Sequence, residues 1–237
     1  MCLAILSACG GDDNGSSTPT PPPTATSAEG LWEGTTSTGR SVGGLVLDDG
    51  SYWFVYTVIG NPNVVAGVVQ GNGTSNQGSF TSSNTKDFNL ESAGSLDATI
   101  SGSYVQKNSL NGTITYLSGG GTSSFTTTYN ADYELAPNMT LVAGTYSVRT
   151  ANNQRVTVAI SSAGALTGNS TDGCTYTGSL SPRAKGNVFN STVTGVCSNG
   201  TFTFDGVAFY DAATQTLYSA GLNNTRTNGF LFISTKL

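Results

Sequence analysis

Apolar and polar residues alternate in short runs along most of the chain. Every second position is apolar in Val156–Ile160, and Phe202 and Phe204 alternate with threonines. This period of two is typical of half-buried strands, and no segment keeps the roughly 3.6-residue apolar period of a helix. Turn-forming residues separate the runs at Asp48-Asp49-Gly50, Asn61-Pro62-Asn63, Gly119–Gly121, Asp172-Gly173 and Asn199-Gly200. The chain is therefore predicted to be all-β and antiparallel.

The predicted strands fall into two halves of similar size. About sixteen strands are expected after the first 29 residues, and Leu135–Met139 forms a pause between two groups of them. The halves open alike, with Gly30-Leu31-Trp32 and Gly144-Thr145-Tyr146. About eight strands is the number at which an antiparallel meander closes into a small barrel. We expect two tandem β-barrel-like domains, at residues 30–137 and 138–237, with a single large β-sandwich as the alternative.

Glycine is unusually frequent, with 31 residues in a chain of 237. Glycine inside a strand permits sharp bends and close approach of neighbouring groups. Several glycines fall within strand-like runs rather than turns: Gly43, Gly44, Gly67, Gly71, Gly102, Gly168, Gly178 and Gly206. This distribution favours closed, strongly coiled sheets over a flat sandwich.

The N-terminus has the pattern of an export signal. Leu6-Ser7-Ala8-Cys9 resembles the lipobox of bacterial lipoproteins, and this resemblance implies cleavage before Cys9 and lipidation of its sulfur. Gly10 after the cysteine, rather than Asp, implies the outer membrane by the sorting habit of that family. Residues 1–8 are then a truncated signal without the usual basic residues, and a freely soluble exported protein is the alternative. Residues 9–29, rich in Pro, Thr and Ser, are predicted to form a disordered tether.

Two further resemblances concern the body of the chain. Gly30-x-Trp32 resembles the opening of lipocalin-type barrels, in which the tryptophan closes the barrel floor. In the second half, the element Gly173-Cys174-x-x-x-Gly178 is followed by Cys197. This spacing is similar to that of a group of proteobacterial β-barrel lipoproteins, for which no activity is assigned. The resemblance implies location and fold, and no chemistry.

Composition excludes several classes of function. The chain contains no His, so a Ser-His-Asp triad, a Cys-His dyad and a His-ligated zinc are all excluded. Nine basic residues against 14 acidic ones give a net charge of −5, which argues against nucleic-acid binding. No stretch approaches the roughly 20 apolar residues of a membrane helix.

The cysteines divide into two pairs by position. Cys2 belongs to the predicted signal, and Cys9 is the lipidation site that the lipobox resemblance implies. Cys174 and Cys197 form an even pair in an exported domain, so we predict a disulfide between neighbouring strands. A redox or metal-binding pair would be expected to show CxxC spacing, which is absent here.

No catalytic or metal-binding constellation is recognisable among the other polar residues. A glycosidase needs two carboxyl groups facing each other across a cleft. The available carboxylates form no signature: Glu33, Glu91, Glu134, Asp97, Asp132, Asp205 and Asp211. Asp48-Asp49 is interpreted as a turn. Arg183-Ala184-Lys185 is interpreted as a solvated hairpin end, with contact to an anionic partner as the alternative.

Aromatic residues are the best candidates for a binding surface. In the run Tyr52, Trp53, Phe54, Val55 and Tyr56, one strand face must fill the barrel interior and the other must face the partner barrel or a ligand. A second aromatic group in the C-terminal half, Phe209, Tyr210 and Tyr218, is interpreted first as part of the core of the second barrel. The candidate ligand or interface residues are Trp32, Tyr52, Trp53, Phe54, Tyr56, Phe209, Tyr210 and Tyr218.

Together these features predict an envelope protein that binds rather than catalyses. We expect a lipoprotein anchored to the outer membrane through Cys9, without cofactor, metal or nucleic acid, that captures a small molecule or a protein. A carboxylate-dependent enzyme acting on polysaccharide and a structural envelope spacer are the alternatives.

Overall fold

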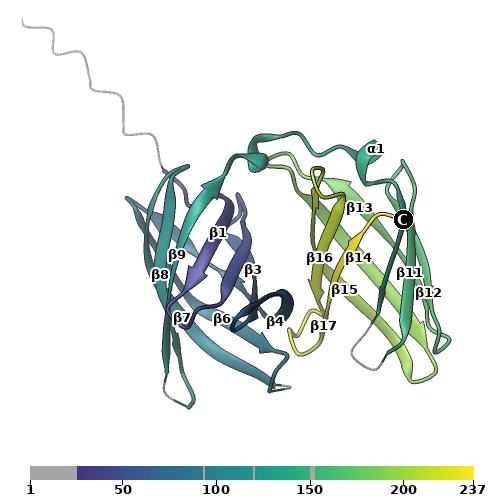
Figure 1. The fold of residues 1–237 in the computed structure, drawn as a ribbon, viewed down its shortest axis with the longest axis horizontal. Helices are drawn as coiled ribbons and strands as arrows, with labels where there is room; N and C mark the ends of the chain where they lie inside the picture. Colours follow the sequence, from purple (N-terminus) through teal and green to yellow (C-terminus); the bar gives the residue numbers. More distant parts are fainter. Residues whose placement is uncertain (1–25, 93, 120, 150–152) are drawn as a thin grey trace, which may run out of the picture.

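A computed structural model gives the fold, and it describes residues 26–92, 94–119, 121–149 and 153–237. Cys2, the lipobox at Leu6–Cys9 and most of the predicted tether lie outside the described residues. The described chain forms two antiparallel barrel-like sheets that lie side by side, joined by a short linker (Figure 1). The predicted fold class is confirmed, and the alternative of a single β-sandwich is wrong.

The first barrel contains strands β1 to β9. Their bounds are β1 Gly30–Thr36, β2 Ser41–Val46, β3 Ser51–Val58, β4 Asn61–Asn72, β5 Thr74–Asn76, β6 Ser79–Asn89, β7 Gly94–Val105, β8 Ser109–Tyr116 and β9 Thr122–Asn130. Neighbours in the sheet follow the order β4-β3-β2-β1-β9-β8-β7-β6-β5. An additional pairing of β4 with β6, from Gly67↔Asn89 to Gln70↔Lys86, closes a ring of strands and leaves β5 as a short appendage.

The second barrel contains strands β10 to β17 in simple sequence order. Their bounds are β10 Gly144–Arg149, β11 Arg155–Ile160, β12 Ala165–Ser170, β13 Thr175–Pro182, β14 Phe189–Cys197, β15 Gly200–Asp211, β16 Thr216–Leu222 and β17 Gly229–Thr235. At the seam between the first and last strands, Tyr146 of β10 forms an isolated bridge with Lys236, which follows β17 directly. Ser234 adds to this seam, since its Oγ accepts from the Ser147 amide at 3.1 Å and donates to the Ser147 carbonyl at 2.9 Å. This barrel is therefore nearly closed.

Both barrels begin with the same local motif. The Trp32 indole Nε1 donates to the carbonyl of Ala28 at 2.9 Å, and the Tyr146 hydroxyl donates to the carbonyl of Val142 at 2.5 Å. In each case the acceptor precedes the aromatic residue by four positions, and both aromatic rings are fully buried. The two similar openings in the sequence therefore become equivalent interior plugs. We call this end of each barrel, where the first strand begins, the linker end.

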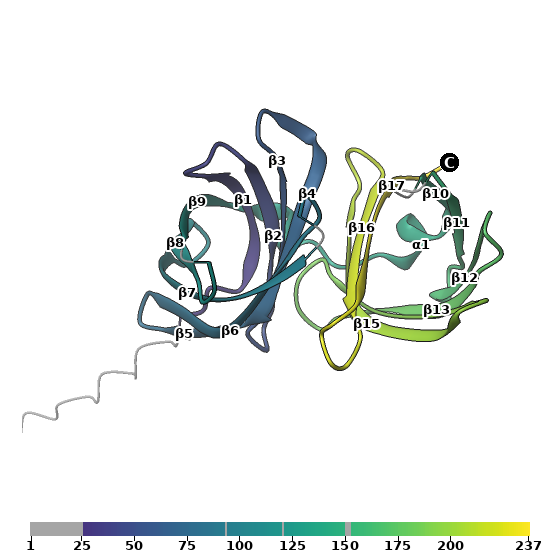
Figure 2. The same cartoon turned by 90° about the horizontal axis from the view of Figure 1, so that it is seen from below.

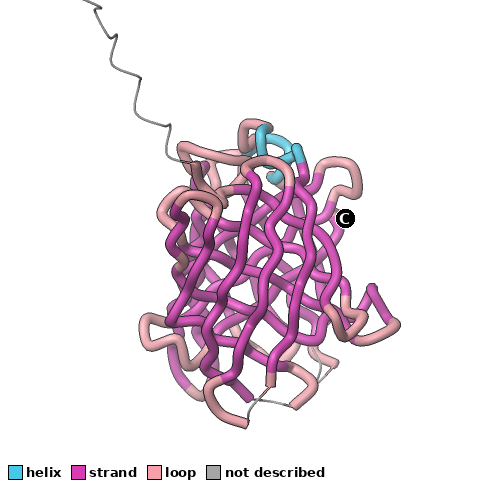
Figure 3. The backbone as a smooth tube through the Cα atoms, turned by 90° about the vertical axis from the view of Figure 1, so that its left-hand side faces the viewer, coloured by secondary structure: helices cyan, strands magenta, loops and turns pink. Residues whose placement is uncertain are grey.

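The linker between the barrels contains the 3-10 helix η1 (Ala131–Glu134) and the helix α1 (Met139–Val142), which are the cyan segments at one end of the molecule in Figure 3. Figure 2, seen from below, shows α1 within the ring of strands β10 to β17. Val142 at the end of this helix is buried in the core of the second barrel. The linker therefore closes one end of the second barrel as well as connecting the two.

Two strand glycines show why the first barrel needs residues without side chains. Gly67 lies opposite Tyr56 and Gly71 opposite Tyr52 in the β3–β4 pairing. A Cβ at Gly67 would lie 2.2 Å from the Tyr56 hydroxyl, and one at Gly71 would lie 2.3 Å from the Tyr52 hydroxyl. The tyrosine side chains thus occupy the space that a side chain on β4 would need. Register irregularities in β3–β4 and β6–β7 add to the curvature of the sheet.

The two barrels share a mixed interface. A small apolar cluster spans it, with Leu45 and Leu47 from the first barrel and Val207 from the second. Around this cluster, Arg183 binds Asp48 at 2.6 Å and Asp49 at 3.3 Å. The interpretation of Arg183 as a solvated hairpin end is therefore wrong, because this side chain spans the interface to carboxylates of the other barrel.

Two other sequence predictions need correction. The segment Asn61–Asn63 begins strand β4, and the turn lies just before it at Ile59-Gly60. The predicted tether includes residues that are packed on the first barrel. Ala28 is fully buried and its amide donates to Ser75 Oγ, while Glu29 forms an ion pair with Lys185 of the second barrel at 3.8 Å. The predicted disordered tether therefore does not extend to residue 29, because Ala28 and Glu29 are ordered parts of the fold.

Candidate functional site

Strand alternation divides the aromatic run of β3 between the two faces of the sheet. Tyr52, Phe54 and Tyr56 point into the first barrel and are buried, while Trp53 lies on the outer face and packs against the inter-barrel cluster. The inward group packs around Phe80, whose ring lies 5.7 Å from that of Tyr52 in an edge-to-face arrangement. These side chains shape the interior of the first barrel.

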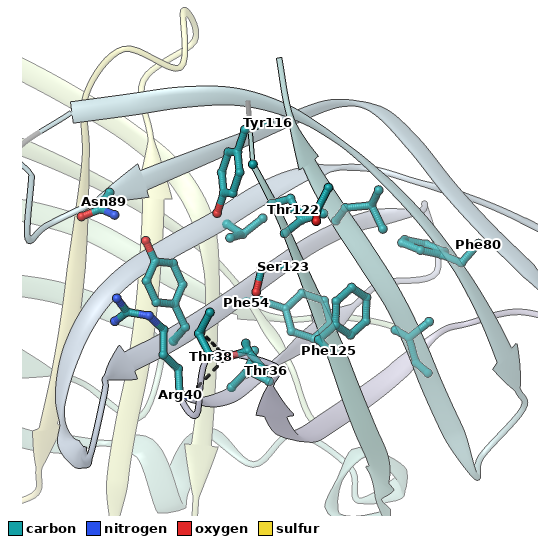
Figure 4. Close-up of a pocket in the computed structure, with 17 residues that line it drawn as sticks. Thr36, Thr38, Arg40, Phe54, Phe80, Asn89, Tyr116, Thr122, Ser123 and Phe125 are labelled. Atoms are coloured by element: carbon teal, nitrogen blue, oxygen red, sulfur yellow. Dashed lines mark hydrogen bonds between the residues drawn. The ribbon is translucent and has the colours of Figure 1, made fainter. Parts of the chain in front are cut away.

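The first barrel is not completely filled. A cavity of about 260 Å³ remains in its interior (Figure 4), and its lining includes Thr36 at the end of β1 but not Trp32 near the start of that strand. Its walls come from β1 to β4 and from β6 to β9. The apolar part of the wall comprises Val42, Phe54, Val69, Phe80, Ile100, Leu110, Ile114 and Phe125, and the polar part comprises Thr36, Thr38, Arg40, Tyr56, Asn89, Tyr116, Thr122 and Ser123. The cavity is apolar within and polar at one end.

A buried carboxylate organises that polar end. Asp87 on β6 is only 1% exposed, and it accepts hydrogen bonds from the hydroxyls of Tyr56 at 2.8 Å and Tyr116 at 2.7 Å. Its position follows from alternation, because Asp87 lies on the same inward face of β6 as Thr85. Each tyrosine hydroxyl uses its single proton on the carboxylate, so its oxygen can only accept from anything in the cavity.

Arg40 lies beside these tyrosines at the end of the cavity. Its guanidinium lies 5.4 Å from the centre of the Tyr56 ring, donates to the Thr57 carbonyl at 2.9 Å and pairs with Glu91 at 2.7 Å. Figure 4 shows Arg40, Tyr116 and Asn89 at the same end of the cavity. We call Arg40, Tyr56, Asp87, Glu91 and Tyr116 the polar cluster.

Burial controls the protonation of the polar cluster. Desolvation raises the pKa of Asp87, and this effect outweighs the opposing hydrogen bonds from Tyr116 and Tyr56 and the charge of Arg40. Burial and the neighbouring Asp87 carboxylate also raise the pKa of Tyr56 and of Tyr116. Both tyrosines are therefore neutral at physiological pH and remain hydrogen-bond donors to Asp87.

The arrangement can bind a small molecule with an apolar body and a polar end. The tyrosine oxygens offer acceptors, and Arg40 has donor positions beyond the two that its partners occupy. The charge on Arg40 is more than balanced by Asp87 and Glu91 when both are ionised. An anionic group is therefore disfavoured at this end, and a hydroxyl, which both donates and accepts, matches it.

The remaining predicted aromatic residues lie in different places. Trp32 plugs the linker end of the first barrel and packs edge-to-face on Tyr129 at 5.4 Å. Tyr210 belongs to the core of the second barrel. Phe209 and Tyr218 lie on the outer face of the second barrel, with ring centres 6.2 Å apart, and both face the recess between the barrels.

The predicted disulfide is confirmed. Cys174 and Cys197 are bonded, and they connect the start of β13 to the end of its antiparallel neighbour β14. This bond is structural, since it closes a hairpin on the second barrel.

The described segments contain neither a cluster of metal ligands nor a membrane-spanning helix. Within them, no three His, Cys, Asp or Glu side chains gather closely enough to hold a metal ion. No helix among the same residues has the length and hydropathy needed to cross a bilayer.

Sequence reasoning missed most of the polar cluster. Tyr56 was a candidate, but Arg40, Asp87 and Tyr116 were not, because they come from three distant segments that only barrel closure brings together. No signal in the sequence marked Asp87, because strict alternation from Phe80 would place it on the opposite face of β6. The register irregularity between Ser82 and Thr85 instead turns Thr85 and Asp87 toward the interior.

Comparison with known proteins adds no assignment. No family model matches the chain, and no curated protein sequence matches it either. The interpretation of the site therefore rests on its geometry and chemistry.

Proposed function

We propose that this protein is a non-catalytic binding module of the bacterial cell envelope, whose first barrel holds a small neutral amphiphile. The observation that carries the proposal is the cavity of about 260 Å³ with an apolar wall and one polar end. Small-molecule sites in proteins are mostly apolar, with a few polar groups that fix orientation, and barrel mouths are common places for them. The polar cluster supplies those groups.

The cavity volume limits the size of the ligand. A cavity of about 150 Å³ holds benzene. By proportion, 260 Å³ accommodates a molecule of about ten non-hydrogen atoms. We propose a medium-length alcohol or an alkyl-substituted phenol, with its hydroxyl against Tyr56, Tyr116 and Arg40 and its chain directed toward Phe80 and Leu110.

We also propose that Cys9 is lipidated and holds the protein at the outer membrane. The lipobox pattern Leu6–Cys9 and the Pro-rich segment after it support this. The described chain begins at Thr26, which contacts the hydroxyl of Tyr104, and Ala28 lies next to Trp32 at the linker end. A tether attached at this end leaves the opposite end, where the polar cluster lies, free to meet a ligand.

A carboxylate-dependent enzyme acting on polysaccharide is less well supported. The two carboxylates of the polar cluster are already engaged, Asp87 by two tyrosine hydroxyls and Glu91 by Arg40. A general acid and base pair would need to contact substrate and exchange protons with it. The geometry instead favours a fixed polar end for binding.

Calorimetry and NMR with defined probes test the ligand. We expect 1-octanol to bind saturably and to shift the methyl resonances of Ile100 and Ile114, with octanoate binding more weakly. Val69→Phe fills the cavity and should abolish binding, whereas Val193→Phe, at a partly buried position in the second barrel, should leave it unchanged. Absence of saturable binding for octanol, octanoate and octylamine alike would refute the ligand proposal and favour a spacer.

Labelling tests the anchor separately. Cells expressing the wild-type chain should incorporate labelled palmitate into it, and Cys9→Ala should lose this label. Cys2→Ala is the matched control and should keep it if Cys2 is removed with the signal. Equal labelling of wild type and Cys9→Ala would refute the lipid anchor.

A further inference from the structure

A second recess lies between the two barrels. It has a volume of about 560 Å³, and both barrels contribute to its wall. Figure 2 shows the strands of the first barrel around β3 and β4 facing β15, β16 and β17 of the second. We call this recess the inter-barrel groove. Ligand sites often form at such junctions between domains.

Three aromatic side chains line the inter-barrel groove. Trp53 comes from the outer face of β3, and Phe209 and Tyr218 come from the outer faces of β15 and β16. Phe209 and Tyr218 are paired across their strands. Tyr218 remains 37% exposed, although the two barrels pack together next to it. The groove therefore presents aromatic faces from both barrels to solvent.

The charged groups of the groove are of one sign. Its lining includes Glu33 from the first barrel and Asp211 from the second, and it contains no lysine or arginine. Glu33 accepts from the amide of Asn130, and Asp211 accepts from amides and the hydroxyl of the turn at Ala213-Thr214. Within the described part of the chain, neither carboxylate has a cationic partner.

The charges of both carboxylates act on the hydroxyl of Tyr218. Burial is the main factor that raises the pKa of its hydroxyl, and the charges of Asp211 and Glu33 raise that pKa further. The two barrels thus direct negative potential toward the same aromatic side chain. By contrast, the acidic groups Asp48, Asp49 and Glu29 elsewhere on the interface each form an ion pair, the first two with Arg183 and the third with Lys185.

We propose that the inter-barrel groove binds an organic cation of the quaternary ammonium class. An alkylated ammonium is attracted to the faces of Trp and Tyr rings, and its methyl groups bury apolar surface against them. The uncompensated charges of Glu33 and Asp211 add Coulomb attraction that a neutral molecule of the same shape does not experience. A neutral sugar or alcohol would use the aromatic faces and gain nothing from the two carboxylates.

This site is independent of the cavity in the first barrel. The cavity is enclosed by the first barrel and the groove lies outside it, and Val42 is the one lining residue that they share. The two sites also favour different ligands, because the cavity favours a neutral hydroxyl and the groove favours a positive charge. Failure of either proposal leaves the other unaffected.

Tryptophan fluorescence provides the test, because the full chain has only two tryptophans and one of them lines the groove. Choline chloride, added at constant ionic strength, should change the emission saturably, and Trp53→Phe should remove this change while Trp32 still reports the folded state. Glu33→Gln and Asp211→Asn each keep an acceptor oxygen but lose the charge, and each should weaken choline binding about three- to tenfold. Asp97→Asn, at an exposed carboxylate paired with Lys86, is the matched control and should have no effect.

The uncharged isostere of choline, 3,3-dimethylbutan-1-ol, isolates the contribution of charge. We expect it to bind at least about threefold more weakly than choline, consistent with loss of the cation–π and Coulomb terms. Equal affinity for the two probes would overturn the proposal, as would no saturable change with choline. An effect of Asp97→Asn as large as that of Asp211→Asn would also overturn it, because it would indicate attraction by the net charge of the protein rather than by the groove.

Discussion

Replacement of Gly71 by Ala tests whether close approach of tyrosine side chains is the reason for glycine on β4. A Cβ at this position would lie 2.3 Å from the Tyr52 hydroxyl oxygen, 2.7 Å from Cζ of that ring and 3.1 Å from Asn84 Oδ1. The Tyr52 ring is fully buried, and its hydroxyl bonds to Ser82 at 2.9 Å and to Thr85 at 2.6 Å. The ring must therefore move, and its hydrogen bonds must break or stretch.

The expected cost follows from these contacts. Overpacking of a well-packed interior costs about 1–3 kcal/mol, and each lost hydrogen bond adds about 1 kcal/mol. Replacing Gly by Ala also lowers the entropy of the unfolded chain, which stabilises the folded state by only about 0.4–1 kcal/mol. We expect Gly71→Ala to lower the free energy of unfolding by about 2–4 kcal/mol, although alanine is ordinarily the better residue in a strand.

Gly43→Ala is the matched control, because a Cβ there would meet nothing closer than 3.9 Å and the residue also lies within a strand of the first barrel. It should leave stability unchanged or raise it slightly. Urea unfolding followed by tryptophan emission measures both variants, since both tryptophans lie in the first barrel. Equal stability of Gly71→Ala and Gly43→Ala would refute the reasoning, because it would mean that Tyr52 can move aside without cost.

Three further predictions concern other parts of the molecule. Cys174→Ser combined with Cys197→Ser should lower the free energy of unfolding by about 3 kcal/mol, because it opens a loop of sequence separation 23 in the unfolded chain. Circular dichroism in urea measures this change. A loss well under 1 kcal/mol would show that the cross-link does not limit the unfolded ensemble. Burial raises the pKa of Asp87, so its bound proton stabilises the folded state fully below the unfolded pKa of about 3.9, and this contribution is lost as pH rises through the folded pKa. The stability of wild type relative to Asp87→Asn should therefore fall from acidic to neutral pH in parallel urea titrations, and a difference that rises with pH would contradict the assigned direction. Arg183→Met removes the contacts with Asp48 and Asp49. It should increase hydrogen exchange of the Asn187 amide, which donates to the carbonyl of Tyr133 in the linker. Arg149→Met is the control and should leave this exchange unchanged, because Arg149 is exposed and bonded within its own hairpin.

The strand pattern was readable from the sequence because its physical basis is local. Alternation with a period of two requires only that one face of a strand meet a core, and turns require only residues that adopt tight backbone conformations. The assignment of Asn61–Asn63 to a turn was wrong because the strand β4 begins there, after a turn at Ile59-Gly60. Local preference identified the bend and misplaced it by two residues.

The candidate sites were only partly readable. The aromatic run of β3 indicated that one face would be internal and one external, but the sequence left open which face was which. The polar cluster was not visible, because Arg40, Asp87 and Tyr116 lie far apart along the chain and meet only when β4 pairs with β6. The role of Arg183 was also misjudged, since its partners lie on the other barrel.

The sequence by itself determined the all-β class, the division into two barrels, the disulfide and the two equivalent openings at Trp32 and Tyr146. Each of these depends on residues close in sequence or on a repeated spacing. Only the tertiary structure decided that the first barrel keeps a cavity, that a carboxylate lies buried at its polar end and that two barrels enclose an acidic aromatic groove. These features depend on which distant strands become neighbours and on how completely their side chains fill the enclosed space, and neither quantity is encoded in a local pattern.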